Sequence, residues 1–223
     1  MSATPTATEV EAGQAVYTPL VLALYDVFVL RFSCRVVWRC PRTQTLALYN
    51  CHVGARHLDV GVGTGYFLDR CEWPVAQPEL TLLDLNPHSL NAAVKRTARY
   101  RPRVVQASVL DPIELGVLQF DSVAMNFLLH CLPGSAEQKA ATVAGNVRPY
   151  LAPGGVVFGS TILGRGVRHN LLGRTLMRTY NKRGIFSNLE DDAAGLERGL
   201  AAALGDVRID VQGTVALFSA REQ

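Results

Sequence analysis

The sequence lacks the cysteine spacing that marks a metal site or a disulfide framework. No Cys-x-x-Cys pair occurs, so a structural zinc site is not expected. The cysteines number five, which is odd, and a chain of 223 residues can bury a core without disulfides. We therefore expect a reduced protein of the cytoplasm. The five are Cys34, Cys40, Cys51, Cys71 and Cys131.

A strong excess of charge of either sign is also lacking. The 22 basic and 19 acidic residues leave a net charge of +3, which is too small to imply a polyanionic partner, so nucleic acid is not expected. Several basic residues lie between residues 165 and 183. They are interpreted as a solvated helix face or, alternatively, as a site for an acceptor carboxylate or phosphate. They are Arg165, Arg168, Arg174, Arg178, Lys182 and Arg183.

No uninterrupted apolar run is long enough to span a membrane. Residues 20–38 are mostly apolar, but Asp26, Arg31 and Arg35 interrupt them. A charge near the centre of a bilayer costs roughly 2.5–3.5 kcal/mol. The first sixteen residues lack the basic start and apolar run of a signal peptide. The segment 20–38 is therefore expected to be a buried helix or helix pair.

From residue 56 onward, short apolar runs alternate with helical patterns. The runs are apolar throughout, which predicts a parallel sheet buried on both faces. The last two runs are joined by Gln212-Gly213, a turn too tight for a parallel crossover, so they should form a hairpin. The expected strands are His57–Val60, Leu80–Leu85, Arg103–Gln106, Phe120–Asn126, Gly155–Leu163, Val207–Val211 and Thr214–Ala220. The expected helices are Tyr66–Cys71, Pro87–Tyr100, Pro112–Leu118, Ser135–Leu151, 166–182 and 189–204.

A glycine-rich loop, Asp59-Val60-Gly61-Val62-Gly63-Thr64-Gly65, follows the first expected strand. Glycines let the backbone turn tightly and approach a ligand, and the helix N-terminus behind them offers free N–H groups. A dinucleotide fingerprint would need a glycine where Tyr66 stands. Asp84 ends the next strand, where a carboxylate can accept both hydroxyls of a ribose. Together these features predict a nucleotide-type ligand at the carboxyl ends of the strands.

Four segments resemble the motif series of class I S-adenosylmethionine (SAM)-dependent methyltransferases: HLDVGVGTGY, LLDLN, FDSVAMNFLLHCLPG and LAPGGVVFGSTIL. The resemblance covers roughly residues 17–220. It is nearest to metal-independent small-molecule enzymes of the ubiquinone/menaquinone-biosynthesis type and their relatives in secondary metabolism. It implies a Rossmann-like α/β fold whose seven-stranded sheet is mostly parallel and ends in an antiparallel hairpin. It also implies an N-terminal tail and helical lid over residues 1–50 and a SAM-binding domain over residues 51–223.

The same resemblance implies a cofactor site for SAM, with S-adenosylhomocysteine (SAH) as the product. Asp59 would orient the glycine loop or hold the SAM ammonium, and Asp84 would bind the ribose. The glycines that would face the methionine part are Gly61, Gly63 and Gly65.

Residues from later segments would contact the adenine and the reaction centre. By resemblance, Leu85 and Asn86 would lie beside the adenine, and Ser108-Val109 would close over its edge. Many relatives have an aspartate at position 108, so Asp111 could supply that contact instead, or the contact could be weaker. Asn126 would line the join between the cofactor and acceptor pockets.

Methyl transfer requires alignment of the acceptor and, for some acceptors, a base. His130 follows the fourth expected strand and is predicted to be that base; the alternative is a positional or SAM-contacting histidine. Tyr25 and Trp38 are predicted to stack on an apolar or aromatic acceptor, and His169 to contribute to its pocket. The alternatives are helix packing for the first two and a solvated surface position for His169.

The sequence thus predicts a SAM-dependent methyltransferase that acts on a small apolar or aromatic acceptor, such as a quinone-like or secondary-metabolite molecule. It shows neither the acidic trio with which catechol-type relatives hold magnesium nor a nucleic-acid-binding appendage. A monomer and a homodimer both fit the sequence. Two alternatives stay open. One is a SAM-fold enzyme that catalyses a cyclisation or elimination without methylation, and the other is a non-catalytic interaction protein that retains the fold.

Overall fold

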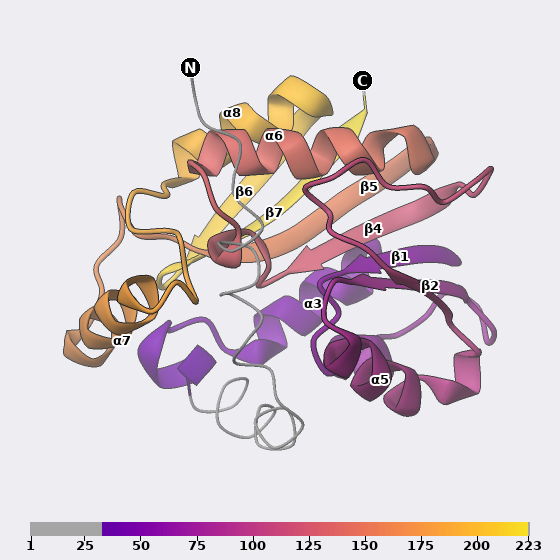
Figure 1. The fold of residues 1–223 in the computed structure, drawn as a ribbon, viewed down its shortest axis with the longest axis horizontal. Helices are drawn as coiled ribbons and strands as arrows, with labels where there is room; N and C mark the ends of the chain where they lie inside the picture. The colour runs from indigo at the N-terminus through magenta and orange to yellow at the C-terminus, as the bar shows by residue number, and fades with distance from the viewer. Residues whose placement is uncertain (1–32, 223) are drawn as a thin grey trace.

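A seven-stranded sheet crosses the centre of the molecule, with helices on both of its faces (Figure 1). The computed structural model describes residues 33–222 of the chain. The strand order is β3-β2-β1-β4-β5-β7-β6, and the pairs among β1 to β5 are parallel. The strands are β1 Arg56–Val60, β2 Glu79–Asp84, β3 Arg103–Gln106, β4 Phe120–Asn126, β5 Leu151–Ile162, β6 Gly205–Gln212 and β7 Val215–Glu222.

The C-terminal hairpin confirms the prediction made from its short connection. Strands β6 and β7 pair antiparallel, with Gln212 opposite Val215. Gly213 adopts φ 63°, which a side chain would disfavour. Strand β7 inserts between β5 and β6 and runs antiparallel to both.

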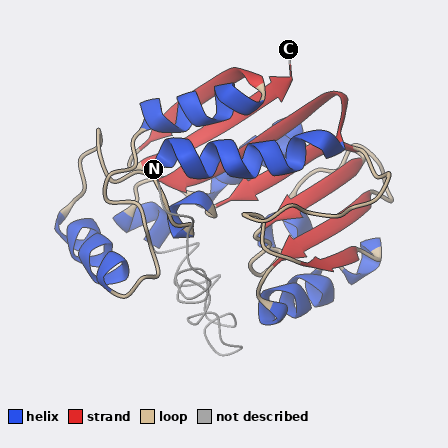
Figure 2. Ribbon diagram, turned by 45° about the horizontal axis from the view of Figure 1, so that its top comes forward, coloured by secondary structure: helices blue, strands red, loops and turns tan. Residues whose placement is uncertain are grey.

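Two layers of helices cover the sheet, as Figure 2 shows. Helices α3 (Arg42–His52), α4 (Tyr66–Arg70) and α5 (Pro87–Arg96) contribute to one apolar cluster with β2, β4 and β5. Helices α6 (Ala136–Val147) and α8 (Ala193–Ala203) pack into a second cluster on the other face. Helix α7 (Leu171–Lys182) contributes to a third cluster with Trp38 and Phe186.

The strand order reverses at β1, which places a crevice at the carboxyl ends of the parallel strands. The chain runs from β1 outward to β2 and β3 and then returns to β4 on the other side of β1. In open α/β sheets this reversal is where ligands bind. The predicted glycine loop begins at the end of β1, and Asp84 and Asn126 end β2 and β4.

The predicted helix Pro112–Leu118 is wrong, because this segment is a loop. Ile113 and Leu115 are both buried, a spacing of two that suits extended chain rather than a helix. The hydroxyl of Tyr150 fixes the loop: it donates to the carbonyl of Ile113 at 2.5 Å and accepts from the N–H of Leu115 at 3.4 Å.

The predicted start of the fifth strand is also wrong. Strand β5 begins at Leu151 and includes Pro153 and Gly154, which were expected to lie between the preceding helix and this strand. A register shift against β4 between Phe120 and Ser122 accommodates these residues. Smaller differences concern helix ends, since α5 and α6 stop at Arg96 and Val147 and short 3₁₀ turns follow them.

Helix α3 lies mostly within the predicted tail and helical lid over residues 1–50, and it crosses the proposed boundary between residues 50 and 51. It packs on β5 and α4 rather than standing apart from the sheet. Most of the predicted N-terminal lid, including Tyr25, lies outside the described residues, so the two-part division stays a prediction. Within residues 33–222 no helix has the length and apolar character needed to cross a bilayer.

Candidate cofactor site

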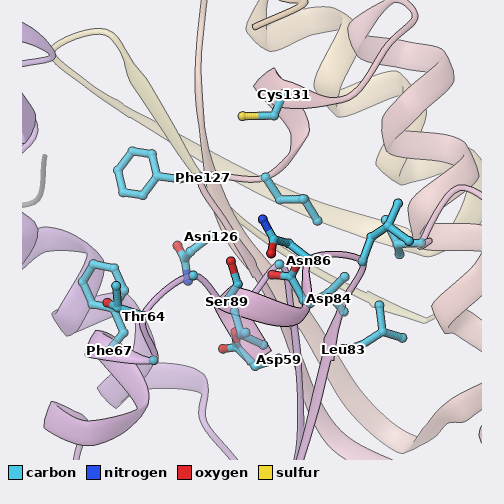
Figure 3. A pocket seen from close by; sticks show the side chains of 18 of the residues that line it. Asp59, Thr64, Phe67, Leu83, Asp84, Asn86, Ser89, Asn126, Phe127 and Cys131 are labelled. Carbon is cyan, nitrogen blue, oxygen red and sulfur yellow. Dashed lines mark hydrogen bonds between the residues drawn. The ribbon is translucent and has the colours of Figure 1, made fainter. Parts of the chain in front are cut away.

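A pocket opens at the carboxyl ends of β1, β2 and β4 (Figure 3). Its wall brings together all ten residues that the sequence assigned to the cofactor, although their individual roles stay predictions. They are Asp59, Gly61, Gly63, Gly65, Asp84, Leu85, Asn86, Ser108, Val109 and Asn126. The pocket therefore gathers four separate segments of the sequence into one site.

The glycine loop needs glycines for two different physical reasons. Gly61 has φ 72°, and a Cβ there would lie 2.8 Å from Cδ1 of Leu128, so a side chain would meet both strain and a clash. Gly63 has φ 51°, but a Cβ there would meet nothing within 4 Å. The loop thus packs closely against the wall at Gly61 and leaves free space at Gly63, where a ligand can approach the backbone.

Asp84 is a largely buried carboxylate that already accepts backbone hydrogen bonds. The N–H of Asn86 donates to its Oδ1 at 2.8 Å. Burial raises the pKa of Asp84 to about 6, although hydrogen bonds from the N–H groups of Asn86, Gly63 and Val62 act in the opposite direction. Neutral hydroxyl donors on a ligand would stabilise its charged form.

Asp59 receives a hydrogen bond that the sequence did not predict. The hydroxyl of Tyr49, from α3, donates to Oδ2 of Asp59 at 2.6 Å, and both residues line the pocket. Nε2 of His57 lies 3.5 Å from the same oxygen. The spacing of Leu46, Tyr49 and Val53 could have marked the buried face of this helix. It could not have identified the partner of the Tyr49 hydroxyl.

Asn126 is the last residue of β4, and one hydrogen bond fixes the orientation of its side-chain amide. The hydroxyl of Ser160 donates to Oδ1 of Asn126 at 2.8 Å. The buried Nδ2 atom of Asn126 finds no hydrogen-bond partner among the described residues. A buried donor without a partner is costly, so this amide is suited to a ligand acceptor.

The residues predicted to contact the adenine line the pocket, and that contact stays a prediction. Asn86 caps α5, with its side chain accepting from the N–H of His88 at 2.8 Å. The hydroxyl of Ser108 accepts from the N–H of Leu110 at 3.2 Å. Asp111 is exposed and does not line the pocket, so nothing in the wall supports it as the substitute adenine contact.

The other end of the pocket is apolar. Phe127 and Cys131 line it together with Leu128, Leu132 and Pro133. In Figure 3, Phe127 and Cys131 occupy the upper part of the view, while Asp59 and Ser89 lie below. Phe127 adopts φ 51°, and its N–H donates to the carbonyl of Ser160 at 2.8 Å. A left-handed backbone at a phenylalanine stores strain, which is typical of functional sites.

His130, the predicted base, is buried behind this wall rather than exposed on it. Its side chain is not among the pocket residues, and its ring packs edge-on against Phe186 at 4.5 Å between centroids. Burial and the nearby charge of Lys139 lower the pKa of His130 to about 3. Neither observation supports a role as base, which stays a prediction.

Of the predicted acceptor residues, Trp38 and His169 lie outside the pocket. Trp38 is only 3% exposed and packs against Phe186 and edge-on against His169, each at 6.2 Å between centroids. Nε2 of His169 donates to the carbonyl of Leu163 at 2.9 Å. Both side chains belong to the layer around α7, and Tyr25 lies outside the described residues. Their contact with an acceptor stays a prediction.

The basic stretch and possible metal ligands add no second site. Arg165 pairs with Glu190 at 3.0 Å in an exposed position. The outward positions of α7 carry Arg174, Arg178 and Lys182. In the part of the chain that the structure describes, no three His, Cys, Asp or Glu side chains gather as a metal ion would require.

Comparison with known proteins places these features among methyltransferases. Residues 58–157 match a family model described as a methyltransferase domain. Demethylluteothin O-methyltransferase of Streptomyces thioluteus is 40% identical over 208 residues, which span 93% of this chain and 90% of the relative. The physcion biosynthesis cluster O-methyltransferase of Aspergillus chevalieri is 41% identical over 218 residues, 97% of each chain. A solved DhpI–SAH complex matches 97% of this chain and 98% of its own with a TM-score of 0.66; at 19% identity that likeness concerns the fold.

Proposed function

Because this chain belongs to the class I SAM-dependent small-molecule methyltransferases, we propose that it methylates a hydroxyl group on an aromatic secondary metabolite. The observation that carries this proposal is a single pocket with two unlike ends. Carboxylates and glycine backbone form one end, and Phe127 and Cys131 form the other. The names of both relatives, each an O-methyltransferase, support oxygen as the acceptor atom.

The residues of the polar end fit SAM in chemistry. SAM supplies an electrophilic methyl group on a sulfonium. Asp84 offers a buried acceptor for ribose hydroxyls, and Asp59 offers a carboxylate for the ammonium. The open space at Gly63 admits the ligand close to the backbone. We assign these three roles as proposals on that fit.

The apolar end suits an aromatic acceptor because it offers aromatic and aliphatic surface without a charged group. The ring of Phe127 can hold an acceptor ring by stacking or edge contact. Apolar walls also exclude water, which aligns the reacting groups and protects them from side reactions. In this proposal the chain contributes mainly alignment and desolvation.

Deprotonation of the acceptor is the step to which the side chains of the pocket contribute least. A phenol whose pKa is near the working pH needs no protein base. His130 stays the candidate base for less acidic acceptors, and its pKa of about 3 counts against it. Two sequence features support a further part of the proposal: the odd cysteine number without a disulfide pattern fits a cytoplasmic enzyme, and the net charge of +3 fits one that binds no nucleic acid.

The test uses methyl-deuterated SAM and a matched panel of acceptors. The panel contains a polycyclic phenol, the corresponding aryl amine and a non-aromatic alcohol of similar size. We expect SAH to form only with the phenol, together with a product that carries the CD3 group. Reaction with the amine alone would contradict the choice of oxygen. A product without the CD3 group would point to cyclisation or elimination instead.

A further inference from the structure

Beneath the glycine loop, a buried tyrosine is positioned by aromatic packing. Tyr49 is 2% exposed; its ring stacks on Phe67 with centroids 5.4 Å apart and meets Phe158 edge-on at 5.1 Å. These contacts leave the ring little freedom to turn away. Its hydroxyl donates to Oδ2 of Asp59 at 2.6 Å. Burial and the charge of Asp59 raise the pKa of Tyr49 well above 10, so the hydroxyl keeps the proton that it donates.

The imidazole of His57, in β1, lies near the same carboxylate oxygen. Ser122 Oγ accepts the N–H of Gly54 at 2.7 Å and lies 2.7 Å from Nδ1 of His57. Nε2 faces Oδ2 of Asp59 at 3.5 Å. Oδ2 of Asp59 thus receives the hydrogen bond of Tyr49 and lies near the imidazole of His57, which leaves Oδ1 for a ligand.

We propose that Tyr49 is a positioning residue of the SAM site, whose hydroxyl holds Asp59 in the orientation that receives the SAM ammonium. The inference rests on the proposed role of Asp59, but it does not depend on which acceptor is methylated. It also assigns a function to α3. This helix precedes the glycine loop in the chain and supplies the loop's carboxylate with its closest donor.

The experiment compares two ligands that differ only at the methionine end. SAH carries the ammonium and carboxylate, whereas 5′-methylthioadenosine keeps the adenosine and lacks both. Tyr49→Phe keeps the ring contacts and removes the hydroxyl. We expect its Kd for SAH to rise about tenfold, the lower range for a hydrogen bond to a charged group. Its Kd for methylthioadenosine should stay within about twofold of the wild-type value, which we take as the error of such comparisons.

The matched control is Tyr150→Phe, which removes a structural hydroxyl bound to the carbonyl of Ile113 away from the pocket. It should lower the melting temperature without changing the ratio of the two Kd values. In an Asp59→Asn background, Tyr49→Phe should change that ratio no further, because the hydroxyl acts through Asp59.

Equal weakening of SAH and methylthioadenosine by Tyr49→Phe would overturn the proposal, because it would indicate a scaffold role. An unchanged Kd for SAH would overturn it as well. So would a Tyr49→Phe protein without a cooperative melting transition, since the hydroxyl would then be needed for folding. Wild-type SAH binding without methylation of any phenol would instead contradict the proposed function and leave this test intact.

Discussion

Replacing Asp84 with asparagine should change the stability of the free protein and its affinity for SAM in opposite directions. Burial raises the pKa of Asp84 from 3.8 to about 6. Because the folded pKa lies above the unfolded one, the folded state is not penalised below about pH 4. The penalty grows as the pH rises toward 6 and is complete above it. The 2.2-unit difference corresponds to about 3 kcal/mol at pH 7. Asp84→Asn should recover up to that amount.

Affinity should fall in the same variant, because an uncharged amide is a weaker acceptor for ribose hydroxyls than a carboxylate. A hydrogen bond to a charged group contributes about 1.5–3 kcal/mol, which predicts a Kd for SAH about 10 to 150 times higher. In the wild type, protonation of Asp84 converts one acceptor oxygen into a donor. The Kd for SAH should therefore rise about tenfold between pH 7 and pH 5.

Thermal unfolding of the free proteins between pH 4 and 8, and calorimetric titration with SAH between pH 5 and 8, measure both effects. The melting temperature of Asp84→Asn should exceed that of the wild type at pH 7, and the two should converge near pH 4. The Kd of the variant for SAH should not depend on pH in this range. A less stable variant at pH 7, or one that binds SAH as tightly as the wild type, would refute the reasoning.

Three further substitutions test other parts of the site and its support. Gly61→Ala should weaken SAH binding about tenfold in calorimetry, because the new methyl group meets Leu128 at a φ of 72°. Lys139→Met should lower the free energy of unfolding in urea by about 3–5 kcal/mol. In the wild type, Nζ of Lys139 lies 2.6 Å from the buried carboxylate of Asp191, and the substitution leaves that carboxylate unpaired. Adding Asp191→Leu should therefore recover most of the lost stability. His130→Gln should leave the shape of the kcat/KM profile unchanged between pH 5 and 8, because a pKa of about 3 lies below that window. Loss of a titration there would restore His130 as the base.

The polar half of the site could be predicted because its information is local. A glycine loop after an apolar strand, and an acid at the end of the next strand, occupy fixed places in a parallel sheet. Once β1, β2 and β4 lie side by side, Asp59, Asp84 and Asn126 must meet at their carboxyl ends. The closing hairpin was predictable for a similar reason, since its turn length allows only antiparallel pairing.

The residues of the apolar end of the pocket could not be predicted one by one, because their side chains depend on packing between distant elements. Trp38 and His130 occupy sequence positions from which a side chain could reach the pocket. In the structure, however, both rings pack against Phe186 in the layer around α7. Tyr49 is a residue that the sequence did not assign to the site but that the structure places there. No neighbouring residue in the sequence indicates that its hydroxyl donates to Asp59. The loop taken for a helix, Pro112–Leu118, depends similarly on the hydroxyl of Tyr150.

The wall of the pocket carries several unfavourable features in the free protein. Asp84 holds a charge against its burial, Nδ2 of Asn126 has no partner among the described residues, and Phe127 adopts a left-handed backbone. Each costs free energy that the surrounding core must offset. A ligand with hydroxyl donors for Asp84 and an acceptor for Asn126 removes two of these costs directly. Substitutions that stabilise the free protein at these positions should therefore weaken ligand binding, and the pocket wall is where stability and function oppose each other most strongly.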